Sequence, residues 1–193
     1  EPLTNGNPST NRTGDDLSRT LQIFRTLVES QSSEWNFKRM LGLWGELSIL
    51  ERALSLCESQ LEELACLRAW QSNGIHCQDY CFRNASSAFD VKTTAKNQRI
   101  HEISSIDQVA ERELESTYLL SVVVRPVGPG EGWTVLDLVS RIEDSLSGTS
   151  KETFIEIIES INPDQDLCGA HNLRERHNRP PMLFLPNQIP GVS

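Results

Sequence analysis

The feature that most constrains the fold is the run from Tyr118 to Val124, which is almost unbroken in apolar and β-branched side chains. Such a run is typical of a strand that is covered on both faces. Apolar residues recur at helical spacing before and after it, and these helices would cover the strand. The sequence therefore predicts an α/β sandwich: helices, a mixed sheet, then helices again. The predicted helices span residues 15–29, 35–56, 58–70, 108–115, 134–146 and 151–161.

Two short alternating segments upstream predict a β-hairpin. Residues 78–82 and 87–93 alternate between polar and apolar side chains, and Arg83–Ser86 between them has the composition of a turn. If these four residues close the hairpin, Phe82 faces Ser87, and the numbers of each opposed pair sum to 169. Asp79 then faces Asp90. A further strand is expected over residues 99–103.

Two carboxylates and a lysine share one face of this hairpin. The Cβ atoms of directly opposed residues lie roughly 4.5–5.5 Å apart, so Asp79 and Asp90 repel each other. Lys92 projects from the same face as Asp90, while Phe89 and Val91 place the opposite face in a core. Such a group favours a divalent cation. The alternative is an exposed strand face on which Lys92 neutralises the two aspartates and nothing more happens.

Glu46 lies among apolar neighbours on the predicted helix over residues 35–56. A carboxylate in such a place needs a partner, because an isolated buried charge costs several kcal/mol or becomes neutral. A metal ion or a lysine would supply that partner; the alternative is that Glu46 reaches solvent at the edge of the apolar stripe. Gly42 and Gly45 each cost roughly 1 kcal/mol in a helix interior. Both make sense if another backbone passes close by.

This set of residues points to metal-assisted phosphodiester chemistry. Asp79 and Asp90, with the Val91 carbonyl, would hold Mg²⁺ or Mn²⁺, which prefer oxygen ligands. The metal would polarise the scissile phosphate and lower the pKa of a bound water. Lys92 would orient that water or help to deprotonate it and would offset charge in the transition state. Glu46 would bind a second metal or position a water.

The net charge of −9 and the isoelectric point of about 5.0 count against nucleic-acid binding, because phosphate affinity comes from Lys and Arg. They do not decide the question, since binding depends on where the charge lies. Several basic residues fall near the candidate site or in the tail, where they would form a rim that faces the substrate. These residues are Lys96, Arg99, Arg174, Arg176 and Arg179.

The 193 residues fit one domain. We expect a flexible lead-in over residues 1–14, the domain itself over residues 15–161, and a Pro/Arg-rich extension over residues 162–193, in which 182–185 are a docking segment or an interrupted strand. The first residue is Glu1, which indicates a natural start upstream or its removal. Five cysteines without a regular framework suit a reducing cytoplasm, and neither a signal pattern nor a membrane-spanning apolar run is present.

Part of the chain carries a resemblance. It runs from about Leu41 to Gln108, and its motifs are Gly42-Leu43-Trp44-Gly45-Glu46-Leu47, Ala69-Trp70, Asp79, Asp90-Val91-Lys92-Thr93-Thr94 and Ile103-Ser104-Ser105-Ile106-Asp107-Gln108. The Asp79 and Asp-Val-Lys elements resemble the PD-(D/E)XK nuclease superfamily, the fold of restriction endonucleases. The longer pattern resembles a bacterial family assigned to that superfamily, found among restriction-modification and phage-defence genes and often near DNA methyltransferases.

The resemblance implies a restriction endonuclease-like core, with a central mixed sheet and helices on both faces. It assigns Asp79 and Asp90 as metal ligands, Lys92 as the catalytic lysine and Glu46 as the acid from the first core helix. Gln108 resembles the superfamily's downstream glutamine, which would fix the water or Lys92; the alternative is an amide on a helix surface.

The sequence departs from the superfamily pattern at three positions. Gln78 replaces the motif's proline, and Asp90 stands where glutamate is commoner, which shortens the reach of the carboxylate by one methylene. Arg112 stands where the superfamily has a tyrosine, so the role of Gln108 is open.

These features together predict a Mg²⁺-dependent endonuclease that hydrolyses double-stranded DNA in a bacterial restriction-modification or phage-defence system. The alternative, which the acidic charge favours, is a non-catalytic DNA-binding or assembly subunit with a nuclease-like fold. A third possibility is a structural α/β domain that binds no Mg²⁺. The expected partners are DNA, DNA methyltransferase or ATPase subunits of the same system, and a second copy of the chain, with no membrane partner and a cytoplasmic location.

Overall fold

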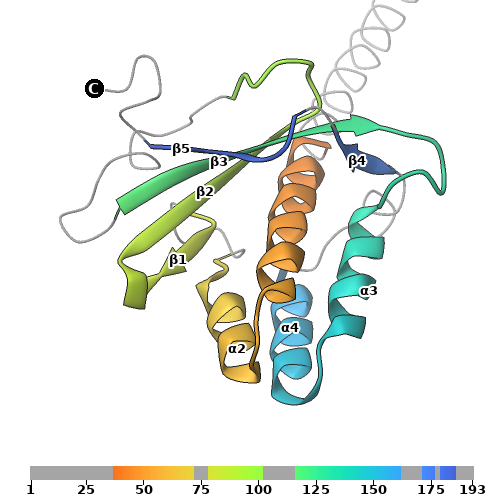
Figure 1. The fold of residues 1–193 in the computed structure, drawn as a ribbon. Helices are drawn as coiled ribbons and strands as arrows, with labels where there is room; N and C mark the ends of the chain where they lie inside the picture. The colour runs from red at the N-terminus through yellow and green to blue at the C-terminus, as the bar shows by residue number, and fades with distance from the viewer. Residues whose placement is uncertain (1–36, 72–77, 102–115, 162–170, 177–178, 186–193) are drawn as a thin grey trace, which may run out of the picture. The chain divides into compact units, whose positions relative to one another are not determined.

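The computed structural model describes residues 37–71, 78–101, 116–161, 171–176 and 179–185. By its contacts the chain divides into two units, Glu1–Lys38 and Arg39–Ser193, and the fold described here is that of the second. It contains a mixed five-stranded sheet with helices packed beside it, which confirms the predicted α/β class (Figure 1). No helix in the described ranges combines the length and the apolar character that a membrane crossing requires.

The predicted buried strand is β3 (Ser116–Pro126), which lies at the centre of the sheet. One edge pairs in parallel with β2 (Ser87–Thr94). The other edge pairs antiparallel with two short strands in succession, β5 (Met182–Phe184) and β4 (Leu173–Glu175). Three consecutive residues of β3, Val122 to Val124, have no exposed surface. Consecutive residues point to opposite faces, so both faces of this strand are covered there.

The hairpin has the predicted register. Strand β1 (Tyr80–Phe82) and β2 are joined by the short helix η1 (Arg83–Ala85) and by Ser86, which adopts a left-handed conformation with φ 47°. Tyr80 pairs with Phe89 and Phe82 with Ser87, so the paired numbers sum to 169. The strand itself begins at Tyr80, two residues later than expected. Asp79 therefore lies just before the ladder.

The described helices lie together on one side of the sheet (Figure 1). Residues 37–55 are helical, and α2 (Gln60–Ala69), α3 (Val135–Ser145) and α4 (Gly148–Ile161) follow. The start of α3 has a capping box, because Thr134 accepts a hydrogen bond from the Asp137 amide and the Asp137 carboxylate accepts one from the Thr134 amide. The helices expected over 15–29 and 108–115 lie outside the described residues.

Close contacts fix the 37–55 helix against the hairpin. A Cβ placed on Gly45 would lie 1.7 Å from Thr93 Oγ1, so only glycine permits this approach. The Tyr80 hydroxyl donates a hydrogen bond of 2.7 Å to the backbone carbonyl of Glu46. The close neighbour of Gly45 is thus a side chain of β2. At Gly42 no described residue lies within 4 Å of such a Cβ, so the described part of the chain makes no close approach there and that expectation is wrong.

Two elements differ from the sequence prediction. Residues 99–101 are not a strand: the Ile100 amide donates to the Gln98 carbonyl within a local turn, and the side chains of Arg99 and His101 bind Ser121. Residues 102–103 lie outside the described ranges. Strand β4 was not predicted, because Leu173-Arg174-Glu175 is too short and too charged to show alternation.

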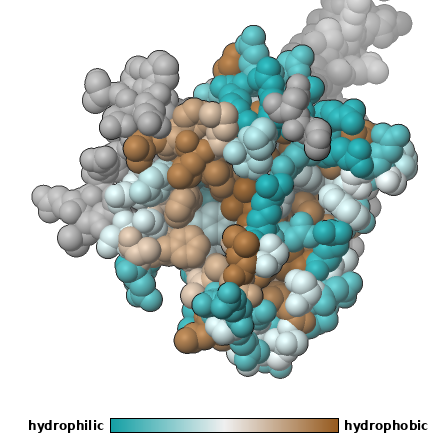
Figure 2. All heavy atoms as spheres, viewed as in Figure 1, coloured by the Kyte–Doolittle hydropathy of each residue, from teal (hydrophilic) through white to brown (hydrophobic). Residues whose placement is uncertain are grey.

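The tail segment 182–185 contains a strand, β5, as one of the two predicted possibilities. Met182 and Leu183 remain 45% and 50% exposed. Apolar residues gather over this part of the sheet, where β2, β3 and β5 lie (Figure 2). The strand thus contributes little buried surface, and its pairing with Leu119–Ser121 holds it in place.

The Gly45 contact gives a matched pair of stability predictions. Gly45→Ala should lower the free energy of unfolding by about 1–3 kcal/mol, because the new methyl group must displace Thr93 or the helix. Gly42→Ala should instead raise it by up to about 1 kcal/mol, because the site has room and alanine favours the helix. Chemical denaturation measures both. Equal effects of the two substitutions would contradict the packing described here.

Candidate active site

The first acid of the site, Asp79, uses its side chain to bind the backbone amide of Val91. Its Oδ2 accepts a hydrogen bond of 2.6 Å from the Val91 amide, just beyond the last residue pair of the hairpin. The Asp79 carbonyl accepts another, of 2.7 Å, from the Gln71 amide. Both the backbone and the side chain of Asp79 are therefore fixed. Its carboxyl group lies beside the strand that carries Asp90.

Asp90 and Lys92 form a buried ion pair on β2. Asp90 is 2% exposed, and the side chain of Lys92 is 20% exposed. Lys92 Nζ donates to Asp90 Oδ1 at 3.1 Å and lies 2.9 Å from Oδ2, but the contact with Oδ2 lacks the geometry of a hydrogen bond. These exposures do not fit the alternative of a solvated strand face. Asp90 Oδ2 is left buried with no hydrogen-bond donor.

Glu46 reaches the site from the 37–55 helix. Its Oε2 accepts a hydrogen bond of 2.8 Å from Trp70 Nε1. The residue keeps some accessible surface, but its carboxyl group is packed within protein, and burial is the main cause of its raised pKa. The alternative in which Glu46 reaches freely into solvent therefore does not hold. Trp70 was quoted in the sequence pattern without a role, and the structure gives it one as the donor that orients Glu46.

The three acids lie near one another. Side chains alternate along β2, so Asp90 and Lys92 project from the face opposite to Thr93, which contacts the helix that carries Glu46. The charges of Asp79 and, to a smaller extent, Asp90 raise the pKa of Glu46, so the three carboxyls interact electrostatically. Asp79 and Asp90 form the pair that lies within hydrogen-bonding reach.

Burial and mutual repulsion favour the protonated acids. Burial raises the pKa of Glu46 to about 8, and the charge of Asp79 adds to the effect. Burial and then the charge of Asp90 raise the pKa of Asp79 to about 7. The pKa of Asp90 is also raised by burial, with Lys92 acting in the opposite direction. A carboxyl of Asp79 that keeps its proton can donate it to Asp90, and the two groups lie within hydrogen-bonding reach.

The donor set fits a hard divalent cation. Asp79 and Asp90 are adjacent carboxylates, and Asp90 Oδ2, which contacts the Lys92 ammonium without a formal hydrogen bond, is an oxygen that a cation could also coordinate. Across the described ranges, no three His, Cys, Asp or Glu side chains are grouped to hold a metal ion. Two carboxylates are nevertheless enough for Mg²⁺, which usually keeps several waters and adds substrate phosphate oxygens. Val91 uses its amide to hold Asp79, and its carbonyl remains the predicted third ligand. Gln108 lies outside the described residues.

A second group beside Lys92 was not recognised from the sequence. Lys92 is paired with Ser121 across the β2–β3 ladder, so their side chains share a face. Ser121 Oγ lies 2.6 Å from His101 Nε2 and accepts a hydrogen bond of 3.0 Å from Arg99 Nη1. Burial, with the charges of Lys92 and Arg99, lowers the pKa of His101 to about 4. Ser121 is a polar residue within an otherwise apolar run, and this was the sequence feature that could have indicated a polar group at this position.

The raised pKa values predict that the metal-free protein loses stability as the pH rises from about 6.5 to about 8. In this window the unfolded carboxyls are already ionised, while folded Asp79 and Glu46 still hold protons and lose them. Each proton is worth up to about 1.4 kcal/mol per pH unit. Below about pH 6.5 the lowered pKa of His101 acts in the opposite sense, because its protonation favours the unfolded chain.

Denaturation in a chelator at several pH values measures this slope. Glu46→Gln should flatten it, whereas Glu152→Gln, on the exposed side of α4, should leave it unchanged. Mg²⁺ should stabilise the protein more at the higher pH, where binding displaces fewer protons. A stability that is level or rises between these pH values would show that the acids are ionised without cost.

Comparison with known families agrees with this geometry. A family model described as "Putative PD-(D/E)XK family member, (DUF4420)" matches residues 5–162, which is more than half of the chain. A search of curated proteins and a search of solved structures each returned no match. The match includes the 37–55 helix, the hairpin, β3 and the residues that the sequence pattern singled out. The chain belongs to this family of the PD-(D/E)XK group, which has a nuclease-like fold.

Proposed function

We propose that this protein is a divalent-metal-dependent endonuclease that hydrolyses phosphodiester bonds in double-stranded DNA. The observation that carries the proposal is the buried Asp79–Asp90 pair with the Lys92 ammonium beside it. Buried carboxyl groups of this kind repel each other when ionised, and a cation relieves the repulsion. Membership of the PD-(D/E)XK family supports the same chemistry.

A bound Mg²⁺ or Mn²⁺, held by Asp79, Asp90 and the Val91 carbonyl, would supply Lewis-acid activation of the phosphate and of a water. The chain's own residues do the positioning. The Val91 amide fixes the Asp79 carboxylate, and Lys92 balances the charge of Asp90 when no substrate is present. With DNA bound, the Lys92 ammonium would orient the attacking water and offset charge on the phosphate.

Glu46 has the features of a positioning residue or a proton acceptor for that water. Trp70 Nε1 holds one carboxylate oxygen, and the Tyr80 hydroxyl holds the backbone carbonyl of the same residue. A pKa of about 8 lies near the working pH of a general base, where proton transfer is efficient. Asp79 is the acid whose charge affects it most, so the Glu46–Asp79 pair is also the place for the second metal expected from the sequence.

We place this activity in the domain over residues 15–161, in a bacterial restriction-modification or phage-defence system. Double-stranded DNA is the substrate, and DNA methyltransferase or ATPase subunits of that system are the expected partners. Two active sites are needed to cut two strands, so a homodimer is expected. Gln108 would fix the water or Lys92 from the segment after β2. The bacterial cytoplasm is the expected location.

The direct test is cleavage of supercoiled plasmid DNA with Mg²⁺ or Mn²⁺. Lys92→Ala should lower the cleavage rate by at least about 100-fold, because it removes the group that orients the water and stabilises charge. Lys151→Ala, which removes a partly exposed lysine of α4 that pairs with Glu143, should cleave at the wild-type rate.

Loss of Lys92 also leaves Asp90 buried without its partner, which can cost about 3–5 kcal/mol of stability. Asp90→Asn is therefore the second variant, since it removes the charge and keeps the shape. It should be folded, inactive and no longer stabilised by Mg²⁺. A wild-type protein that binds DNA but does not cut it under any metal condition would favour the non-catalytic subunit instead. Cleavage that survives in folded Lys92→Ala would exclude the assigned site.

A further inference from the structure

Three arginines lie at one edge of β3, where the paired strands leave a gap. Strand β5 pairs with Leu119–Ser121 and β4 with Val124–Pro126, so Val122 and Val123 lie between the two ladders. Arg99, Arg176 and Arg179, here called the arginine cluster, gather at this gap. Within the described ranges, none of the three forms an ion pair with an acid, whereas Arg52 and Arg141 each do.

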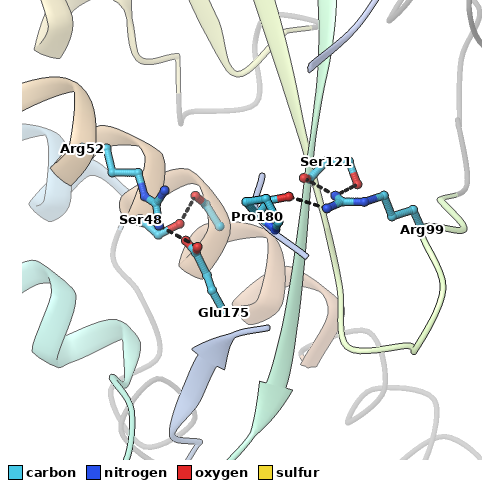
Figure 3. Close-up of polar contacts among 7 residues, drawn as sticks. Ser48, Arg52, Arg99, Ser121, Glu175 and Pro180 are labelled. Carbon is cyan, nitrogen blue, oxygen red and sulfur yellow. Dashed lines mark hydrogen bonds and ion pairs between the residues drawn. The ribbon is translucent and has the colours of Figure 1, made fainter. Parts of the chain in front are cut away.

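Among the described residues, Arg99 is held by neutral oxygen atoms. Its Nη1 donates to the Ser121 carbonyl at 2.7 Å and to Ser121 Oγ at 3.0 Å, and its Nη2 donates to the Pro180 carbonyl (Figure 3). The side chain thus extends from the loop after β2 to the segment before β5. These contacts use donors of both Nη atoms but do not neutralise the charge. Burial, and then the charge of Arg179, lower the pKa of Arg99.

The other two arginines are held next to Arg99 by the backbone. The Arg176 amide donates to the Val123 carbonyl at 2.9 Å, and the Arg179 amide donates to the Arg176 carbonyl at 2.8 Å. Arg179 directly precedes Pro180, which Arg99 binds. Arg176 Nε is buried and has no hydrogen-bond partner. The charges of Arg99 and Arg179 therefore repel each other, and Arg176, whose backbone lies beside Val123, adds a buried donor that is not used.

The arginine cluster is continuous with Lys92. Ser121 pairs with Lys92 across the ladder and binds both Arg99 and His101. Arg99 has no acceptor atom, so Ser121 Oγ accepts from it and its own hydrogen is free to point at His101 Nε2. His101 is then neutral, with its proton on Nδ1, in agreement with its low pKa. Ser121 and Arg99 lead from Lys92 to Arg179 without an acid, and Glu175, which directly precedes Arg176, is paired with Arg52.

We propose that the arginine cluster binds a backbone phosphate of DNA that flanks the phosphate held at Asp79, Asp90 and Lys92. This inference rests on the proposed function, because it names the surface on which the same substrate lies. Guanidinium groups donate hydrogen bonds in pairs to phosphate oxygens, and an anion would relieve the repulsion within the cluster. The chain carries a net charge of −9, so its affinity for DNA depends on a local site of this kind.

The test measures binding of a labelled DNA duplex by fluorescence anisotropy in a chelator, where no cleavage occurs. Arg179→Gln is the first variant, because no hydrogen bond of the Arg179 side chain is part of the fold described above. It should weaken binding about tenfold, by a similar factor for unrelated sequences, and reduce the slope of log affinity against log salt by about 1. Arg176→Gln should act in the same direction. Arg68→Gln, on the exposed face of α2 and on the helix side of the sheet, is the matched control.

The outcomes separate this inference from the proposed function. Wild-type binding that weakens in Arg179→Gln and Arg176→Gln but not in Arg68→Gln supports the phosphate site, whether or not the wild type cleaves DNA. Equal affinity and equal salt slope in all four proteins overturn it, even if cleavage depends on Lys92. A wild type that does not bind duplex DNA overturns it as well. Circular dichroism of each variant confirms that the fold is retained.

Discussion

The close approach of the 37–55 helix to the hairpin brings Glu46 to the strand that carries Asp90 and Lys92. Gly45 allows the helix to touch Thr93, and the Tyr80 hydroxyl fixes the next residue, Glu46, through its backbone. A side chain larger than hydrogen at residue 45 would clash with Thr93 and force either that side chain or the helix that carries Glu46 to move. The position of an acid is therefore controlled by a residue that has no side chain of its own. Trp70 then selects the orientation of the Glu46 carboxylate.

The electrostatics of the site follow from this packing. Asp79 and Asp90 lie beside each other at the strand pair, Glu46 interacts with both from the helix, and only Asp90 has an ion-pair partner among the described residues. Low solvent access makes each ionised form expensive, so the pKa values rise. Along the Lys92–Ser121 ladder the sign of the local charge changes. Arg99 and Arg179 lie near each other there, and neither forms an ion pair with an acid in the described part of the chain. An acidic centre beside a basic edge suits a polyanion such as DNA that binds together with a metal cation. The cation would neutralise the acids, and the phosphates would neutralise the arginines.

Much of this arrangement could be predicted from local sequence. The register of the hairpin follows from the length of the turn at Arg83–Ser86, and the central strand follows from an apolar run that no helix pattern explains. The roles of Asp79, Asp90 and Lys92 depend on that register, so the proximity of these residues was predictable. Strand β4 and the Arg99–Ser121–His101 group were not, because each depends on contacts between segments far apart in the chain. Gly42 and Gly45 look alike in the sequence, and only the position of Thr93 distinguishes them.

The ion pair between Lys92 and Asp90 has a thermodynamic consequence. The ammonium group and a divalent cation compete for the same carboxylate oxygens, so the lysine weakens metal loading whenever it has nowhere else to go. A nucleic-acid strand offers the ammonium an alternative anion and thereby frees Asp90. By linkage, metal and nucleic acid then strengthen each other's binding by the same factor. If the proposed function holds, the resting protein would bind a cation weakly, and the hydrolytic centre would assemble only once a substrate strand lies across the sheet.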